Sequence, residues 1–450
     1  MSLNTRTGKY LGWGGAAALL LLLLPNAALA QEAAAAAPTP NKGDTAWMMT
    51  STVLVLLMIL PGLALFYGGL ARTKNMLSVM TQVGAAAALA MLVWVGWGYT
   101  MAFGDGGNAV IAGFGKAFLK GVTPDSTVAT FSDGVVIPEY VFICFQMTFA
   151  AITLALVLGS VVERIKFAAV LVFGVVWLTI VYFPIAHMVW AGNGLFYTWE
   201  PAALDFAGGT VVHINSGVSA LVACLILGKR IGYPREPMPP HSLVMTGIGT
   251  GLLWVGWFGF NAGSALEANG SAALAMINTF AATAAAGLAW MLAEKITGRK
   301  PSALGFCSGI IAGLVAITPA AGNSGPLGAI VLGAVAGIIC YFAVSFLKPR
   351  LGYDDALDTF GIHGIGGIVG ALGTGVVYAA SLGGPSGEDY DMGGQLVVQA
   401  LTVGTTIIWA AVGTAIAIFV AKLLTGLRVK EEVEREGLDL GEHGERAYNH

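Results

Sequence analysis

The sequence predicts an all-α protein that crosses a membrane eleven times. Hydrophobic residues make up 56% of the 450 residues and charged residues only 10%, whereas ordinary soluble domains carry roughly 25% charged residues. Eleven apolar runs follow residue 45, and each approaches the ~20 residues that a membrane-spanning helix needs. Lysine and arginine lie almost entirely on one side of these runs, as the insertion of a polytopic protein requires. Glycine, at 63 residues, suits close helix packing in lipid.

The first segment reads as a signal peptide. Arg6 and Lys9 precede the apolar run AAALLLLLLPNAALA, which ends in a small-residue cleavage pattern at Ala30. A charged region, an apolar region and an A-x-A site in this order are typical of secretory signals. The alternative is an uncleaved membrane helix, but a proline and an asparagine interrupt the run. We therefore assign residues 1–30 to a signal peptide and 31–45 to a periplasmic N-terminal segment.

The spans themselves follow in order along the chain. The transmembrane domain is predicted over 46–425, and a cytoplasmic tail over 426–450. Helices 1–5 occupy about 46–228, helices 6–10 about 242–381, and helix 11 about 394–424. The individual spans are predicted at about 46–68, 78–103, 138–160, 167–190, 206–228, 242–264, 272–293, 302–320, 326–347, 359–381 and 394–424.

Charge predicts the orientation of this bundle. With the mature N-terminus outside, the inside loops and the tail contain seventeen lysines and arginines, and the outside contains only Lys42, Lys116 and Lys120. This asymmetry follows the positive-inside rule. The sequence thus predicts a periplasmic N-terminus and a cytoplasmic C-terminus in the inner membrane of a Gram-negative bacterium.

A weak internal repeat relates the fifth span to the tenth. HINSGVSALV begins at His213 and HGIGGIVGAL at His363, and each has a glycine four residues after the histidine. Two successive five-helix units must run in opposite senses, because five is odd. The pattern therefore predicts an inverted repeat plus an eleventh helix, with the substrate path at the repeat interface.

The two histidines are the strongest functional candidates. His213 lies about 12 Å along its helix from Asp205, and His363 about 7.5 Å from Asp358. They therefore enter from opposite faces and can meet near the membrane centre, where two neutral imidazoles can satisfy each other. The alternative is two separately buried histidines, each bonded to a carbonyl; the repeat-related positions favour the pair.

Other charged residues have simpler explanations. Asp205 and Asp358 each open a helix, where an aspartate is a preferred N-cap. Asp205 lies on the outer side, so it can also attract a cation from a distance. Glu163 and Arg164 are expected to form a local ion pair in a cytoplasmic loop.

Aromatic residues gather at the outer ends of three spans. Phe145, Trp190 and Phe260 lie there, and an aromatic belt at the membrane interface is the default explanation. An indole face can also bind a cation, and Ser264, four residues after Phe260, can add an oxygen acceptor on the same helix face.

Several missing motifs narrow the function. The sequence contains no G-x-x-x-x-G-K-[ST], G-x-S-x-G or H-E-x-x-H pattern. The absence of these patterns argues against an ATP-driven pump, an esterase and a metalloprotease. The four cysteines lack metal-ligand spacing. We therefore expect a transporter or channel and not an enzyme, with no cofactor, no metal and no nucleic-acid partner.

Five motifs together resemble the ammonium transporter family, bacterial type. The resemblance runs over about residues 44–448, including the tail GLRVKEEVEREGLDLGEHGERAY. Its motifs are FYGGLARTKNMLS (66–78), FPIAHMVW (183–190), DFAGGTVVHINSGVSALV (205–222), GWFGFNAGSA (256–265) and DTFGIHGIGGIVGALGTG (358–375).

This resemblance implies a homotrimer with one pore per subunit, serving nitrogen assimilation. It implies that Trp190, Phe145 and Ser264 form an outer ammonium recruitment site supported by Asp205. Phe145 and Phe260 would stack as a gate above the pore histidines His213 and His363. The tail would contact the cytoplasmic PII signal protein, and methylammonium would serve as a substrate analogue.

Physical chemistry agrees with this function. An ammonium ion is costly to move into an apolar pore, whereas ammonia is small and neutral. Recruitment of the cation, deprotonation and passage of ammonia would exclude potassium, which has no proton to lose. Proton transfer along the histidines, making transport electrogenic, is a hypothesis. The alternatives are a water, urea or gas channel, and a sensor; a tail of about 25 residues is too short for a kinase domain.

Overall fold

The structure is a computed structural model that describes residues 38–448. The predicted signal peptide lies outside the described residues. Within them, eleven helices are long and apolar enough to cross a membrane, which confirms the predicted number and makes the chain a multi-pass membrane protein. Their bounds are Lys42–Leu70, Thr73–Phe103, Glu139–Leu158, Phe167–Trp190, Gly209–Leu227, Leu243–Gly263, Gly270–Ile296, Ala303–Ala320, Pro326–Leu351, Phe360–Val377 and Met392–Thr425.

Many spans combine α-helical and π-helical pieces. The α-helices are α2 (Lys42–Leu57), α3 (Ala64–Leu70), α4 (Met76–Val93), α5 (Tyr99–Phe103), α6 (Glu139–Leu158), α7 (Phe167–Trp177), α8 (Phe183–Trp190), α9 (Asn215–Leu227), α10 (Leu243–Gly263), α11 (Gly270–Ile296), α12 (Ala303–Ile317), α13 (Pro326–Phe342), α14 (Lys348–Leu351), α15 (Ile365–Val377), α16 (Met392–Thr425), α17 (Glu431–Glu436) and α18 (Leu438–His443). The π-helical segments are η1 (Met58–Leu63), η3 (Trp94–Gly98), η5 (Leu178–Tyr182), η6 (Gly209–Ile214), η8 (Ala343–Leu347) and η9 (Phe360–Gly364).

The remaining elements are short. Strands β1 (Thr127–Ala129) and β2 (Val136–Pro138) form an antiparallel pair with Val128 opposite Ile137. Single 3-10 turns occur at η2 (Thr73–Asn75), η4 (Ala117–Leu119), η7 (Thr318–Ala320) and η10 (Ala380–Leu382).

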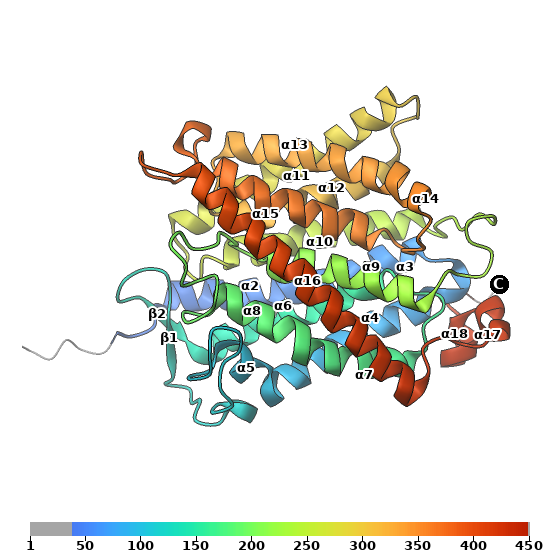
Figure 1. Cartoon of the computed structure of the whole chain (residues 1–450), viewed down its shortest axis with the longest axis horizontal. Helices are drawn as coiled ribbons and strands as arrows, with labels where there is room; N and C mark the ends of the chain where they lie inside the picture. The colour runs from blue at the N-terminus through green and yellow to red at the C-terminus, as the bar shows by residue number, and fades with distance from the viewer. Residues whose placement is uncertain (1–37, 449–450) are drawn as a thin grey trace, which may run out of the picture.

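The long helices lie side by side, and the two ends of the bundle differ (Figure 1). The hairpin β1–β2 lies at one end, which we call the vestibule end, together with the connecting segments 104–138 and 191–208. Helices α17 and α18 lie at the opposite end, which we call the tail end. Helix α16 runs obliquely across its neighbours and packs against α7, α9 and α15.

Polar side chains begin several spans. Asn41 accepts hydrogen bonds from two backbone N–H groups of α2, and Asn269 does the same for α11. Ser242 and Ser302 cap α10 and α12 in the same way. Such caps satisfy N–H groups that have no partner within the helix. The sequence therefore marks the starts of these spans, and the helices begin within five residues of the predicted bounds.

Glycines let the fifth and tenth spans cross closely. A Cβ atom on Gly217 would lie 2.2 Å from the nitrogen of Gly364, and one on Gly367 would lie 3.0 Å from the nitrogen of Ile214. Each glycine is the one four residues after a histidine, so the sequence motif and the contact coincide. Any larger side chain at Gly217 would force the two helices apart.

Candidate functional site

A cavity of about 800 Å³ opens at the vestibule end. Its wall includes Trp190, Asp205 and Ser264, which the sequence singles out, together with Gln146 and Phe149, which it does not. The side chains come from α6, α8, the residue that follows α10 and the segment before η6, so the cavity joins several spans.

Asp205 caps the helix that carries His213. Its carboxylate accepts hydrogen bonds from four successive backbone N–H groups and one hydroxyl, contributed by Gly208, Gly209, Thr210 and Val211. The carboxylate is thus occupied by the start of η6, and only its charge is left to act on the cavity. Its backbone oxygen accepts a hydrogen bond of 2.9 Å from Trp190 Nε1, which fixes the indole beside the cap.

The ring stacked on Phe260 is that of Phe149, and the predicted pair of Phe145 with Phe260 is wrong. The centroids of Phe149 and Phe260 lie 4.1 Å apart with an interplanar angle of 10°. Phe145 is fully buried one helical turn away, 4.8 Å from the Phe149 ring, and is not part of the cavity wall. Phe149 also contacts the Trp190 ring edge-on at 5.8 Å. The sequence placed two phenylalanines on one helix face, and depth along α6 decides between them.

Two residues of the cavity wall, Ser264 and Gln146, carry side-chain oxygens that can accept hydrogen bonds. Ser264 donates its hydroxyl to the carbonyl of Phe260 at 2.8 Å, which leaves the lone pairs of the Ser264 oxygen free. Gln146 also lines the cavity; its Oε1 is covered by neighbouring atoms and has no hydrogen-bond partner among residues 38–448, so its side chain must turn to present the oxygen to the cavity. An aromatic face with two acceptors beside it is chemistry suited to a small cation that can donate hydrogen bonds.

The two histidines meet beneath the stacked phenylalanines. Both are buried, and their Nδ1 atoms lie 3.2 Å apart. The His213 ring lies 6.1 Å from the Phe260 ring and 5.4 Å from the Trp257 ring, on which it stacks. His213 belongs to η6 and His363 to η9, and such π-helical turns recur at functional sites.

The hydrogen-bond partners of Thr318 determine the tautomers of His213 and His363. The Thr318 hydroxyl donates to the carbonyl of Leu314 at 2.8 Å and accepts from Trp257 Nε1 at 3.0 Å. Its remaining lone pair faces His213 Nε2 at 3.3 Å, so that nitrogen carries the proton. His213 Nδ1 is then the acceptor, and His363 Nδ1 donates to it. The neutral pair therefore presents His363 Nε2 as a bare nitrogen.

The space around the histidines is small and almost wholly apolar. A cavity of about 10 Å³ is lined by both imidazoles, Trp257, Phe260 and a set of apolar side chains, namely Met58, Leu63, Phe66, Ile152, Leu156, Leu253 and Ile311. This volume is near the minimum that holds one water-sized molecule. Such a lumen favours a small neutral species over a hydrated ion.

Asp358 does not cap the tenth span, contrary to the sequence prediction. It forms an ion pair with Lys348 at 2.6 Å, and Asp355 accepts the hydrogen bond from the N–H of Phe360 at 2.7 Å. Asp355 is buried, and burial raises its pKa to about 6, against the lowering effect of Lys348. Asp354, Asp355 and Asp358 lie close together in the sequence, and the sequence does not indicate which of them faces the start of the helix.

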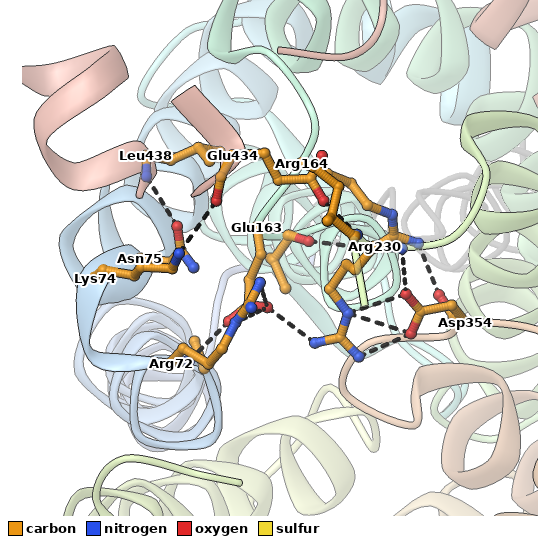
Figure 2. A network of polar contacts seen from close by, with 12 residues as sticks. Arg72, Lys74, Asn75, Glu163, Arg164, Arg230, Asp354, Glu434 and Leu438 are labelled. Atoms are coloured by element: carbon orange, nitrogen blue, oxygen red, sulfur yellow. Dashed lines mark hydrogen bonds and ion pairs between the residues drawn. The ribbon is translucent and has the colours of Figure 1, made fainter. Parts of the chain in front are cut away.

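The tail end contains a buried ionic network (Figure 2). Glu163 pairs with Arg72 at 2.8 Å and with Arg230 at 2.9 Å, and Arg230 also pairs with Asp354 at 2.8 Å. Burial alone would raise the pKa of Glu163, but the facing guanidinium groups hold it below its usual value. The predicted local pair of Glu163 with Arg164 is wrong, since Arg164 donates to the carbonyls of three residues, Val162, Gly228 and Asp354.

The tail packs onto this network. Glu434 of α17 accepts a hydrogen bond from the N–H of Ile231 and pairs with Arg428. The Leu438 N–H donates to Asn75 Oδ1 at 2.8 Å, and Asp439 accepts from the N–H of Ser78 at 2.7 Å (Figure 2 shows the first contact). The tail is therefore attached to the loops between spans.

Sequence reasoning missed four residues of the site, Gln146, Phe149, Trp257 and Thr318. Phe149 and Trp257 had a usable signal, because each lies on the same helix face as a residue already chosen. Gln146 and Thr318 had none: their roles depend on what faces them from other spans. No group of three or more His, Cys, Asp or Glu side chains within residues 38–448 is arranged to hold a metal ion.

Comparison with known proteins identifies relatives along almost the whole chain. The model of the Ammonium Transporter Family matches residues 46–448. An ammonium transporter of Aquifex aeolicus is 47% identical over 412 residues, covering 90% of this chain and 93% of the relative. One of Bacillus subtilis is 46% identical over 408 residues, covering 90% and 98%.

Solved structures agree with this match. Mep2 of Candida albicans has a TM-score of 0.78 at 36% identity and covers 87% of both chains. A structure described as a sensor Amt protein has a TM-score of 0.81 at 28% identity, covering 89% of this chain and 98% of that one.

Proposed function

Because the chain belongs to the ammonium transporter family, we propose that it takes up ammonium across a membrane. The family's members are transporters and not enzymes. The observation that carries this proposal is the order of side chains along one line: an aromatic and oxygen-lined vestibule, a stacked phenylalanine pair, and a histidine pair in an apolar lumen.

Recruitment takes place in the vestibule. The cation binds the face of Trp190, whose indole is held by the carbonyl of Asp205, and donates hydrogen bonds to Ser264 and Gln146. Gln146 is added here to the recruitment residues predicted from sequence, and Phe145 contributes only by packing behind Phe149. The Asp205 carboxylate is saturated by the helix cap, so it attracts the cation by charge without binding it.

Deprotonation comes before the stacked rings, with water in the open vestibule as the first acceptor of the proton. Phe149 and Phe260 form the gate, and the lumen beneath them offers no polar group to an ion except the imidazoles. Moving an ammonium ion into such a space without its hydration is costly, whereas ammonia passes as a neutral molecule. Potassium has no proton to lose, so it is excluded from the lumen at this step.

The histidines guide the neutral molecule. His363 Nε2 is the bare acceptor of the pair, so it receives a hydrogen bond from ammonia after ammonia has passed the gate. The separated proton can follow along the same nitrogens only after both imidazoles exchange tautomers, so that His213 Nε2 becomes the acceptor; such transfer would make net transport electrogenic.

The orientation follows from charge. Lysine and arginine are concentrated at the tail end, so we assign the tail end to the cytoplasm and the vestibule end to the periplasm. With residues 1–30 as a cleaved signal peptide, the protein resides in the inner membrane with its N-terminus outside. The two five-helix units then form an inverted repeat whose interface contains the histidines.

Assembly and regulation complete the proposal. The protein is a homotrimer with one pore in each subunit, and the tail on the cytoplasmic side is the contact for a PII signal protein. The similarity to a sensor Amt protein supports a secondary sensing role. Mass measurement in nanodiscs tests the trimer, and pull-down with purified PII tests the partner.

Proteoliposomes provide the test of the main function. Saturable uptake of methylammonium that ammonium inhibits and potassium does not is the expected result. Currents on solid-supported membranes after ammonium pulses test the proton route. Uptake without charge movement would refute the electrogenic version, and an absence of saturable uptake would refute the transport function.

A further inference from the structure

Helix α16 carries two fully buried glutamines one turn apart near its vestibule end. Gln395 and Gln399 are 3% and 2% exposed, and the Nε2 of Gln395 donates to the Oε1 of Gln399 at 3.2 Å. A buried amide is stable only when its donors and acceptors are paired. The hydrogen-bond partners of these two side chains therefore show which segments α16 holds in place.

Gln399 holds the segment that precedes the vestibule aspartate. Its Oε1 accepts from the N–H of Leu204 at 2.8 Å, and its Nε2 donates to the carbonyl of the same residue at 2.9 Å. The side-chain amide of Gln399 thus forms hydrogen bonds with both the N–H and the carbonyl of Leu204, as a neighbouring β-strand would. Gln395 adds a hydrogen bond to the same segment, because its Nε2 donates to the carbonyl of Ala202 at 2.9 Å.

The same amide also reaches the tenth span. Gln399 Nε2 donates to the carbonyl of Ala371 at 2.7 Å, eight residues or about 12 Å along the helix from His363. Gln399 is therefore bonded at once to the segment before the fifth span and to the helix of the second histidine.

Leu204 is next to the residue that organises the vestibule. Asp205 follows it directly, caps the helix of His213 with its carboxylate, and receives the Trp190 indole on its carbonyl. A shift of Leu204 would move the cap, the indole and the start of η6 together. Catalytic and binding geometry of this kind is sensitive to displacements of about 1 Å.

We infer that Gln399 is the positioning residue of the recruitment site, setting the Trp190 indole and the Asp205 charge relative to the helix of His363. The inference rests on the proposed function, because it needs a cation to be recruited at Trp190. Gln399 itself does not line the vestibule, so it acts through Leu204 and not by touching the cation.

The test compares Gln399→Leu with a matched change on the same helix. Thr414 also makes a buried interhelical hydrogen bond, donating to Ser219 at 2.7 Å, and its oxygen accepts a hydrogen bond from Trp177. It lies about four helical turns from Gln399. Thr414→Val therefore removes an interhelical tie of α16 without touching the segment before Asp205.

Initial rates of methylammonium uptake are measured in proteoliposomes containing equal amounts of protein. Gln399→Leu is expected to raise the half-saturation concentration about fivefold or more, with a maximal rate within about twofold of the wild type. Thr414→Val is expected to leave the half-saturation concentration unchanged. Gln399→Met, which keeps the side-chain length, is the second variant if the leucine variant does not fold, and it should behave alike.

Two results would overturn the inference. One is a folded Gln399 variant with the wild-type half-saturation concentration. The other is an equal rise in Thr414→Val, since that would show a general structural effect. Wild-type vesicles that show no saturable uptake would instead remove the proposed function, and this inference with it.

Discussion

The Nδ1 atoms of His213 and His363 lie 3.2 Å apart, at the crossing of two helices that glycines bring into backbone contact. Neither imidazole is placed there by its own helix alone. Gly217 permits the approach from one side and Gly367 from the other, so the pair exists only where the two spans meet.

Replacing either histidine should impair transport far more than folding. His213→Asp removes two hydrogen bonds, to His363 and to Thr318, and His363→Ala removes one and leaves a cavity, so each should cost about 2–4 kcal/mol of unfolding free energy. Uptake of methylammonium should fall at least about tenfold or lose its selectivity over potassium, while the melting temperature in detergent changes by only a few degrees. Full selective transport in both variants would contradict the assigned role.

The two phenylalanines of α6 should have different effects. Phe149→Ala removes the ring stacked on Phe260, so potassium should reach the histidines and inhibit methylammonium uptake, which it does not do in the wild type. Phe145→Ala leaves that stack in place and should keep potassium without effect, although it creates a core cavity and costs about 3–5 kcal/mol of stability. Equal potassium sensitivity in both variants would argue against the gate.

Neutral substitutions at Asp205 separate its two roles. Asp205→Asn and Asp205→Ser remove the charge and keep one acceptor oxygen of the two, so part of the cap is lost and each should cost about 2–4 kcal/mol of unfolding free energy. The half-saturation concentration for methylammonium should rise several-fold in both, because the charge that attracts the cation is gone. A lowered melting temperature with an unchanged half-saturation concentration would leave Asp205 as a cap alone.

The buried network at the tail end should be a strong stability determinant. Glu163→Gln leaves Arg72 and Arg230 without their shared carboxylate and should cost about 3–5 kcal/mol. The control is Glu431→Gln, which removes only the exposed pair with Arg435 and should not change the melting temperature measurably. A similar melting temperature in the two variants would show that the network contributes little.

Asp355 should make stability depend on pH between about 4 and 7. Its folded-state pKa is raised to about 6 by burial, so its contribution is fully present below the unfolded pKa of about 3.9 and is lost as pH rises through 6. A rise of the Asp355 pKa from about 3.9 to about 6 corresponds to about 3 kcal/mol of stability. The melting temperature of Asp355→Asn, relative to the wild type, should therefore rise from pH 5 to pH 7.5; a constant difference would contradict the assignment.

Local patterns account for the features that the sequence predicted correctly. Hydrophobicity over about twenty residues defines a span wherever that span packs, so all eleven were found within a few residues of their bounds. Asp205 is the cap that the sequence indicates, and its hydrogen bonds reach only the next six residues of the chain. The histidine-glycine spacing is equally local.

Choices between similar residues were decided only by tertiary structure. Phe149 and not Phe145 meets Phe260, because depth and rotation of one helix against another select the partner. Asp355 and not Asp358 caps the tenth span, because Asp358 is engaged by Lys348 at the end of the ninth span. Glu163 passes over its neighbour Arg164 for Arg72 and Arg230, which come from distant loops. The sequence by itself determined the membrane fold and the residues able to act, through interactions within single helices. Which of them face one another, and the Gln399 contact that holds Leu204, depend on packing between spans hundreds of residues apart.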